Sequence, residues 1–353
     1  MTAAPRKRVV ITGATGNVGT ALLRAVAASA PHWQVTGLAR RLPDRTVAPY
    51  DTADWVGLDL GDPGVGTRLR RVLEGADAVV HLAWALQPSR DPALMTRTNL
   101  DGSQHLIDAA RAAGVGHFVH TSSLGAYSPM HGSSHKPRMR EDWPTGGIKS
   151  SLYSRQKVAV ERMLDLLEGE PDAPLVTRLR PGLVLQGAAA TAFSRYFLGA
   201  LAPAAALAPR LPLLPVPNGM LGSAVHADDL ADALVRIVEQ RAGGAFNIAA
   251  EPPLDAATVA HALGARRLPV PFALTRAVTS ATWWLRIQPT DAGWLDIARS
   301  CPLLDTTRAR EVLGWEPRRS PVDALAEVGD GLASGAGVDA SPVLAGRGND
   351  DKD

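Results

Sequence analysis

A tyrosine and a lysine four residues apart are the first sign of acid–base chemistry in this sequence. Tyr153 and Lys157 fall within a helical pattern over 151–167, so their side chains share one face of the helix. A free tyrosine has a pKa near 10, and a nearby ammonium group favours the phenolate. Lowering that pKa to about 7 requires the phenolate to be stabilised relative to the phenol by roughly 4 kcal/mol. The pair is therefore predicted to exchange a proton with a bound molecule.

Three hydroxyl side chains follow the predicted strand over 117–120. Thr121, Ser122 and Ser123 come directly after the apolar run 117–120, which is predicted to be a strand of a parallel sheet. Ligands of such sheets bind at the carboxyl ends of the strands. A hydroxyl group at this place can donate a hydrogen bond to the oxygen of a carbonyl substrate.

A glycine-rich turn over 12–19 follows the first predicted strand, 9–11. Its three glycines permit a tight turn, close approach of the backbone to a pyrophosphate and close packing of the next helix. The N-terminus of that helix offers N–H groups and partial positive charge to phosphate. The turn therefore predicts a dinucleotide site, and the contacts are assigned to Gly13, Thr15, Gly16, Asn17, Val18 and Gly19.

The end of the second predicted strand, 34–38, bears on the type of dinucleotide. NAD sites usually carry an acidic residue about 20 residues beyond the last glycine. This sequence has Arg40 and Arg41 there instead. Because guanidinium groups make bidentate contacts with phosphate, the sequence favours NADP(H) over NAD(H), although solvated surface charges are the alternative interpretation. A positively charged nicotinamide would help Lys157 to lower the pKa of Tyr153.

The scaffold of these residues is predicted from alternating patterns. Strands are also expected at 78–82 and 175–179, and helices at 17–30 and 99–113. Such alternation gives right-handed crossovers and a doubly wound parallel sheet, the Rossmann-type α/β fold.

The alternation loosens after Pro181, and this change sets the expected domains. A Rossmann domain is predicted over 1–180. A smaller, mainly substrate-binding lobe is predicted over 181–330, with strands that return to the Rossmann sheet. The tail, 331–353, is rich in Gly, Ala, Ser and Asp, and disorder is expected there.

The composition excludes several classes of protein. The 353 residues are 46% hydrophobic, which rules out global disorder, and the formal charge of +2 has no basic stripe for nucleic acid. A single cysteine cannot form an internal disulfide, so a cytoplasmic location is expected. The apolar stretch 196–217 is interrupted by Arg210 and five prolines, so no membrane partner is expected, and no metal site is predicted.

As a set, these motifs resemble the extended short-chain dehydrogenase/reductase family, in its NAD(P)-dependent epimerase/dehydratase branch. The resemblance extends to about Ser320. Besides the glycine turn, it rests on Asp59-Leu60, His81-Leu82-Ala83, Asn99-Leu100-Asp101-Gly102, Thr121-Ser122-Ser123, Tyr153-Ser154-Arg155-Gln156-Lys157, Arg180-Pro181-Gly182, Val225-His226-Ala227-Asp228-Asp229 and Leu313-Gly314-Trp315-Glu316-Pro317.

The resemblance implies a role for each matching residue. Tyr153 becomes the general acid/base and Lys157 its assistant and a ribose contact, while Ser123 polarises the substrate oxygen, with Ser122 as the second choice. Asn99, which is counted with the catalytic residues, supports the active-site architecture or a water relay. A homodimer is a family expectation. The remaining cofactor contacts are implied for Asp59 and Leu60 at the adenine, and for His81, Leu82, Ala83 and Pro181.

Three departures from family patterns narrow the chemistry. Leu124-Gly125 follows Ser123 where sugar-nucleotide 4,6-dehydratases carry Asp-Glu. Gly222-Ser223 stands where many nucleotide-sugar enzymes place an Arg-Asp pair for the diphosphate. Cys301, the one cysteine, lies far along the chain from the other site residues, which argues against a role as an epimerising base.

The sequence therefore predicts hydride transfer between a nicotinamide and a secondary alcohol or ketone of a small molecule. Trp84 is expected to form a wall of an apolar pocket, while Trp283, Trp284 and Trp294 are assigned to the core in preference to the pocket lining. Two alternatives stay open. One is a nucleotide-sugar 4-epimerase with tightly bound NAD, and the other is a nicotinamide-sensing regulator without catalysis.

Overall fold

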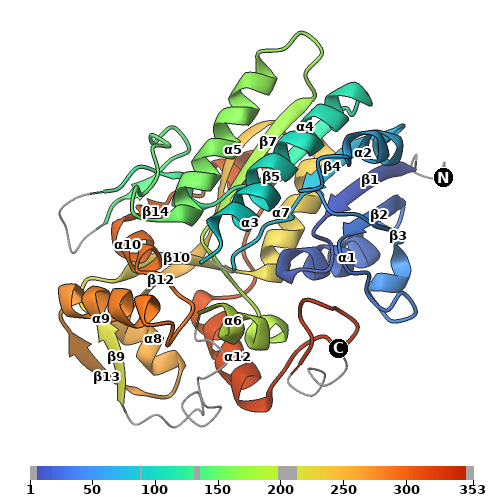
Figure 1. Cartoon of the computed structure of the whole chain (residues 1–353). Coiled ribbons are helices and arrows are strands. Elements are labelled where there is room, and N and C mark those ends of the chain that lie inside the picture. The colour runs from blue at the N-terminus through green and yellow to red at the C-terminus, as the bar shows by residue number, and fades with distance from the viewer. Residues whose placement is uncertain (1–5, 88–89, 131–135, 198–212, 347–353) are drawn as a thin grey trace.

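A seven-stranded, entirely parallel sheet forms the centre of the computed structural model, which describes residues 6–87, 90–130, 136–197 and 213–346 (Figure 1). Strand β1 pairs with both β2 and β4, so the order of the strands reverses around it. This topology confirms the predicted Rossmann-type fold. The order across the sheet is β11 (Gly244–Ile248), β7 (Leu175–Pro181), β5 (His117–Thr121), β4 (Ala78–His81), β1 (Lys7–Thr12), β2 (Trp33–Ala39) and β3 (Asp54–Gly57).

Helices cover both faces of this sheet, which explains why its strands are apolar throughout. Val9, Val10 and Ile11 are fully buried although their side chains alternate between the two faces. One face packs against α1 (Asn17–Ser29), α7 (Ala227–Gln240) and α11 (Thr307–Leu313). The other packs against α2 (Gly66–Leu73), α4 (Gly102–Ala112) and α5 (Leu152–Glu168).

Short elements connect these layers. The predicted helix over 99–113 is divided, because α3 (Pro92–Thr96) and a wider π-type turn over Arg97–Asp101 precede α4. Single 3₁₀ turns occur at Tyr50–Thr52, Leu124–Ala126 and Gly187–Ala189. The small strands β6 (Arg138–Met139) and β14 (Leu303–Leu304) pair with each other.

A second lobe covers the carboxyl edge of the sheet. Its three-stranded sheet has the order β12 (Ala250–Asp255), β10 (Leu221–His226) and β8 (Leu183–Leu185), and a separate pair joins β9 (Leu213–Pro217) to β13 (Arg266–Val270). Strand β11 of the main sheet lies between these strands in sequence, as expected for a lobe whose chain returns to the Rossmann sheet. Its helices are α6 (Ala190–Phe197), α8 (Ala256–Ala262), α9 (Phe272–Trp284), α10 (Gly293–Ser300) and α12 (Pro321–Ser334).

Several expectations for this lobe were wrong. Trp283 and Trp284 lie on α9, which is described throughout and has no buried residue, and Trp294 lines a cleft rather than the core. The tail is ordered over 331–346: α12 continues to Ser334, and the chain then folds back toward α1 (Figure 1), with Ser341 and Leu344 almost fully buried. Composition alone missed this packing because a few apolar anchors and one buried serine hold the segment. Residues 347–353 lie outside the described residues.

In the part of the chain that the structure describes, no helix combines the length and the apolar character that crossing a bilayer requires. Most of the apolar stretch 196–217 falls in 198–212, outside the described residues.

Candidate active site

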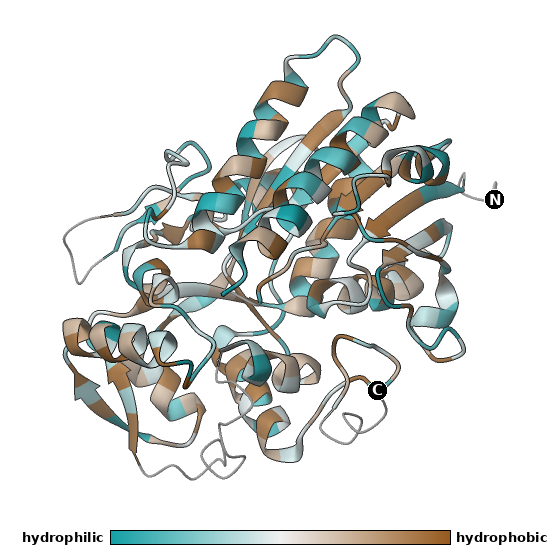
Figure 2. Ribbon diagram, in the orientation of Figure 1, coloured by the Kyte–Doolittle hydropathy of each residue, from teal (hydrophilic) through white to brown (hydrophobic). Residues whose placement is uncertain are grey.

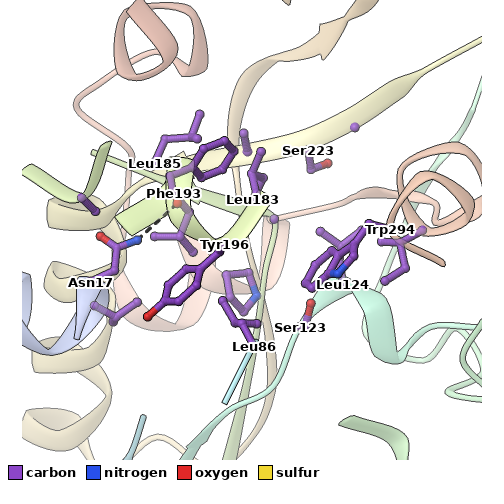
Figure 3. Close-up of a pocket in the computed structure, with 18 of the residues that line it drawn as sticks. Asn17, Leu86, Ser123, Leu124, Leu183, Leu185, Phe193, Tyr196, Ser223 and Trp294 are labelled. Carbon is purple, nitrogen blue, oxygen red and sulfur yellow. Dashed lines mark hydrogen bonds between the residues drawn. The ribbon is translucent and has the colours of Figure 1, made fainter. Parts of the chain in front are cut away.

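A cleft of about 520 Å³ lies at the carboxyl edge of the main sheet. One wall is formed by the glycine turn after β1, the end of β5 and the first turns of α5, and the facing wall is formed by the second lobe. Figure 3 shows Asn17, Phe193 and Tyr196 at one end of the cleft, and Ser123 and Trp294 at the other. The cleft therefore joins the predicted dinucleotide turn to the predicted proton-transfer residues.

The glycine turn has the shape that its sequence predicts. Gly13 has φ +68°, and a Cβ atom there would lie 2.7 Å from the backbone nitrogen of Ala83. A Cβ atom on Gly19 would lie 2.4 Å from the carbonyl oxygen of Gly13, so neither position admits a side chain without rearrangement. Among the described residues, no side chain caps the N-terminus of α1 and its first turn holds no acidic residue, so the amide groups are available to an anion.

The predicted adenosine contacts lie beside this turn but outside the cleft lining. Arg40 and Arg41 are exposed directly after β2. Asp59 is exposed after β3, and its carboxylate accepts a hydrogen bond from the N–H of Gly61 at 2.9 Å. Leu58 N donates to Ala39 O at 3.0 Å, so the chain beyond β3 runs beside the end of β2. The sheet thus brings these residues to one edge.

Several predicted cofactor contacts are structural instead. His81 is buried, with Nδ1 2.8 Å from Thr12 Oγ1 and Nε2 2.9 Å from Ser103 Oγ, and burial lowers its pKa to about 3. It therefore joins two strand ends to α4 and does not line the cleft. Leu60 is buried in the core, Thr15 is buried, and Ala83 approaches Gly13 through its backbone. Leu82 and Pro181 do line the cleft, together with Gly13, Gly16, Asn17, Val18 and Gly19.

Tyr153 and Ser123 meet at the inner end of the cleft. Ser154 Oγ donates to Gly125 O at 2.6 Å, which fixes the start of α5 against the loop after β5. Both side chains line the cleft, and a Cβ atom placed on Gly125 would lie 3.2 Å from a ring carbon of Tyr153 and 3.4 Å from Ser123 Oγ, so the two side chains are neighbours. Burial raises the pKa of Tyr153 to about 12, and the Ser123 hydroxyl opposes the rise only in part. The chain's own groups therefore leave the phenol protonated. The lowering toward neutrality, which was expected from Lys157 together with a positively charged nicotinamide, stays a prediction.

Lys157 is not among the groups that shift the pKa of Tyr153, and its Nζ is engaged by other partners. Nζ donates to Thr121 O at 2.8 Å and lies 3.5 Å from the centre of the Trp84 ring, whereas the centre of the Tyr153 ring is 5.9 Å away. Burial lowers the pKa of Lys157 well below its usual value, and the Glu161 carboxylate opposes that shift. Trp84 lines the cleft as predicted, and its ring also covers the lysine.

Ser122 is committed to a buried ion pair that the sequence analysis missed. Its hydroxyl donates to Glu161 Oε1 at 2.6 Å, and the Glu161 carboxylate accepts two hydrogen bonds from Arg180, at 2.9 and 2.5 Å. Tyr127 also contacts the guanidinium, at 3.1 Å. Ser123 is thus the serine that is oriented toward a ligand. Glu161 lies two turns beyond Ser154 on the same helix, but spacing gave no reason to pair it with β7.

Asn99 supports the site without lining the cleft. Its side chain accepts from Ala85 N at 2.7 Å and donates to Ala85 O at 3.0 Å and to Gln156 Oε1 at 2.8 Å. The amide therefore clamps the segment after β4, which carries Trp84, against α5, which carries Lys157. This geometry makes Asn99 a positioning residue, and its predicted place among the catalytic residues is corrected accordingly.

The second lobe adds an aromatic ring and a thiol to the inner end. The rings of Trp294 and Tyr153 are stacked, with centres 4.7 Å apart and planes at 33°. Cys301 also lines the cleft, although it is distant in sequence, and burial raises the pKa of its thiol to about 12. A thiol that stays protonated is a poor base, so the argument against an epimerising cysteine holds for this electrostatic reason.

The remaining walls are apolar. Among the described residues that line the cleft, only Lys157 and Asp255 carry a charge. Gly222 and Ser223 line it where a nucleotide-sugar enzyme would present a cation to the diphosphate. The apolar side chains include those of Leu86, Leu183, Leu185, Phe193, Val216, Met220, Leu254, Val259, Ile297 and Val328.

Comparisons with known proteins agree with this geometry. The model of the NAD dependent epimerase/dehydratase family matches residues 9–249. A ceramide reductase of Caulobacter vibrioides is 29% identical over 89% of this chain and 87% of its own length. A UDP-glucose 4-epimerase of Mycolicibacterium smegmatis is 28% identical over 91% and 96%. The structure of Thermus thermophilus UDP-glucose 4-epimerase with NAD superposes with a TM-score of 0.65 at 21% identity, over 92% of this chain and 98% of that one.

Some relatives are much longer. The chain spans 29% of the length of an uncharacterized protein of Mycobacterium tuberculosis, to which it is 27% identical over 90% of its own residues.

Proposed function

Because the chain belongs to the NAD-dependent epimerase/dehydratase family, we propose that it is an NADP(H)-dependent oxidoreductase that interconverts a ketone and a secondary alcohol of an apolar molecule. One observation carries the proposal. The hydroxyls of Ser123 and Tyr153 lie at one end of a cleft whose other described lining residues are mostly apolar and include no arginine that could bind a diphosphate. Such walls favour a substrate that gains free energy by leaving water.

The residues around the turn fit a dinucleotide. Asn17 and Val18, at the N-terminus of α1, would hold the pyrophosphate, since Gly13 and Gly19 keep the backbone accessible. Arg40 and Arg41, exposed beyond β2, would hold a 2′-phosphate, and Lys157 would bond the ribose. When bound, the nicotinamide supplies or accepts the hydride. The guanidiniums are the reason for preferring NADP(H).

The protonation state of Tyr153 identifies the source of the proton that the substrate oxygen receives. In the reducing direction, Ser123 donates a hydrogen bond to the substrate carbonyl oxygen, and Tyr153 transfers its proton to that oxygen as hydride reaches the carbon. The C=O bond becomes CH–OH, and the phenol is left as phenolate until water returns a proton. Because burial raises the pKa of Tyr153 to about 12, the donor form predominates at neutral pH.

A pair of tyrosine variants tests the assignment. Tyr153→Phe removes the proton donor and is expected to lower the rate of NADPH oxidation with hydrophobic ketones by about 10² to 10⁴-fold, while NADPH binding changes little. Tyr50→Phe is the matched control, because this buried hydroxyl bonds to Thr20 away from the cleft. Equal rates for the wild type and Tyr153→Phe would refute the mechanism.

The cofactor preference needs its own measurement. Arg40→Ala combined with Arg41→Ala is expected to raise the Kd of NADPH about tenfold or more and to leave the Kd of NADH nearly unchanged. Arg70→Ala, an exposed arginine on α2, serves as the control. Tighter binding of NADH than of NADPH by the wild type would contradict the preference.

The two other functions give different results in the same assays. A 4-epimerase would be purified with NAD bound and would interconvert nucleotide sugars without net nicotinamide oxidation. A regulator would bind the dinucleotide but reduce no member of a carbonyl panel, whatever residue stands at position 153.

A further inference from the structure

Helix α9 exposes several large hydrophobic side chains, whereas its serine and threonine side chains are only half-exposed. Trp284 is 80% exposed, Leu285 70%, Leu274 57% and Val278 52%, and none of the helix's residues, all of which are described, is buried. A helix of a globular protein normally shows the opposite arrangement. The exposed apolar residues fall on one stripe at helical spacing, comprising Leu274, Ala277, Val278, Ala281, Trp284 and Leu285.

Hydrogen bonds fix this orientation. The inward face carries Thr279 and Thr282, and Gln288 Nε2 donates to Thr279 O at 3.0 Å and lies 3.3 Å from Thr282 Oγ1. Arg90 Nη2 donates to Trp283 O at 2.8 Å. The Gln288 bonds stay within α9 and the turn that follows it, whereas the Arg90 bond ties the end of α9 to the segment after β4 in this orientation.

The neighbouring strand pair extends the hydrophobic surface. Leu213 of β9 is 49% exposed and Leu268 of β13 is 44% exposed. Figure 2 shows hydrophobic residues on both α9 and β9 at this corner of the second lobe. Exposed apolar residues gathered in one part of a lobe mark an interaction site more often than an ordinary surface does.

The charge of this region indicates what the surface contacts. Residues 256–290 contain no aspartate or glutamate and four arginines, of which Arg266, Arg276 and Arg286 are exposed. Asp296 pairs with Arg276 and neutralises one of them. The surface thus combines an apolar stripe, an exposed tryptophan at its end and unbalanced positive charge, which are the features of helices that lie in the interface of anionic membranes.

We propose that α9 and the β9–β13 pair dock on the surface of an anionic lipid bilayer, with the α9 stripe entering the headgroup region and the arginines facing lipid phosphates. A second copy of this chain fits less well, because a symmetric contact would place arginines of one copy against those of the other without carboxylates from 256–290 to neutralise them. In this docking no part of α9 or of the β9–β13 pair crosses the bilayer.

The docking surface is connected to the cleft. Gln87 Nε2 donates to Tyr196 O at 2.9 Å and to Pro289 O at 3.3 Å, and Leu86 and Tyr196 line the cleft. Only one residue therefore separates the apolar wall of the cleft from the loop after α9. A bilayer under α9 would lie close to a cavity suited to molecules that dissolve in membranes.

Flotation of the full chain with lipid vesicles tests the docking without reference to catalysis. Binding to phosphatidylcholine vesicles that contain phosphatidylglycerol is expected, with weaker binding to phosphatidylcholine alone. The double variant Trp284→Ser/Leu285→Ser should bind at least about tenfold less. Leu166→Ser is the matched control, because Leu166 on α5 is 76% exposed but lies on the other lobe. Circular dichroism and thermal unfolding would check that each variant folds.

Each outcome decides the proposal. Loss of binding in the double variant, with retention in Leu166→Ser, supports it. Absence of vesicle binding by the wild type overturns it, and a dimer in light scattering that the double variant dissociates would assign the surface to a second copy. Binding that the double variant retains would also overturn it. Because none of these measurements uses NADPH, failure here leaves the proposed activity standing, and failure of the activity leaves the docking standing.

Discussion

Helices α5 and α9 have opposite relations to solvent. α5 buries Val158, Leu164 and Leu167 in the core and holds Tyr153 and Lys157 at the cleft, whereas α9 buries nothing and presents a hydrophobic stripe outward. In α5 the packing of apolar residues fixes the geometry of reacting groups. In α9 hydrogen bonds fix the helix, and the apolar residues remain available for a partner outside the chain.

Removal of a carboxylate from each region should give the largest contrast. Glu161→Ala leaves the buried Arg180 guanidinium without its partner, so we expect a loss of about 3 to 5 kcal/mol in the free energy of unfolding. Asp296→Ala breaks the more exposed pair between Asp296 of α10 and Arg276 of α9. We expect the free energy of unfolding to fall by about 1 kcal/mol or less. Urea unfolding of both variants measures the difference, and equal losses would erase the contrast.

Shortening one leucine in each helix sharpens the comparison. Leu164 is fully buried in α5, so Leu164→Ala is expected to cost about 2 to 5 kcal/mol through lost burial and a residual cavity. Leu274→Ala on α9 should change stability by no more than about 0.5 kcal/mol, because that side chain is already in contact with water. A large loss for Leu274→Ala in thermal unfolding would show that the stripe packs against this chain after all.

Raising the pH should lower stability through groups around the cleft end of α5 and not through α9. The effect should be smaller than those of the two preceding comparisons. The folded protein raises the pKa of Tyr153 from 10.0 to about 12, so this contribution to stability is complete below pH 10 and is lost as the pH rises toward 12. Tyr153→Phe should reduce that loss by about 2 kcal/mol. Tyr127, whose pKa burial also raises to about 12, accounts for a further part. Trp284→Phe should leave the pH profile unchanged, and a profile identical in Tyr153→Phe would indicate that the phenol is not held neutral.

The sequence predicted the parts of this site that depend on local patterns. The sheet, the glycine turn and the approach of Tyr153 to Ser123 follow from strand runs, glycine positions and helical spacing, each of which can be recognised within a short stretch of the chain. The pKa of Tyr153 was not predictable in the same way. It depends on how far folding buries the phenol, which is a three-dimensional property of several elements.

The contacts that the second lobe makes with the site could not be predicted from the sequence either. The stacking of Trp294 on Tyr153 and the place of Cys301 in the cleft join residues that are more than 140 apart in the chain, as their numbers show. The periodicity of α9 is that of a buried helix, and it gives no indication of which side the stripe faces. One contact that ties α9 to the rest of the chain, from Arg90 to Trp283 O, joins residues 193 apart and has no local signal.

The C-terminal segment that follows α12 lies across the phosphate-binding turn. Ser341 Oγ donates to Thr15 O at 2.8 Å, a contact between residues 326 apart, and Asp44 N donates to Ala340 O at 2.9 Å. Val343 and Leu344 reach the wall of the cleft from the same segment. A nucleotide bound at the turn would therefore lie beside this segment. We therefore expect the residence time of the nucleotide to be governed from the far end of the chain, independently of the rate of the chemical step.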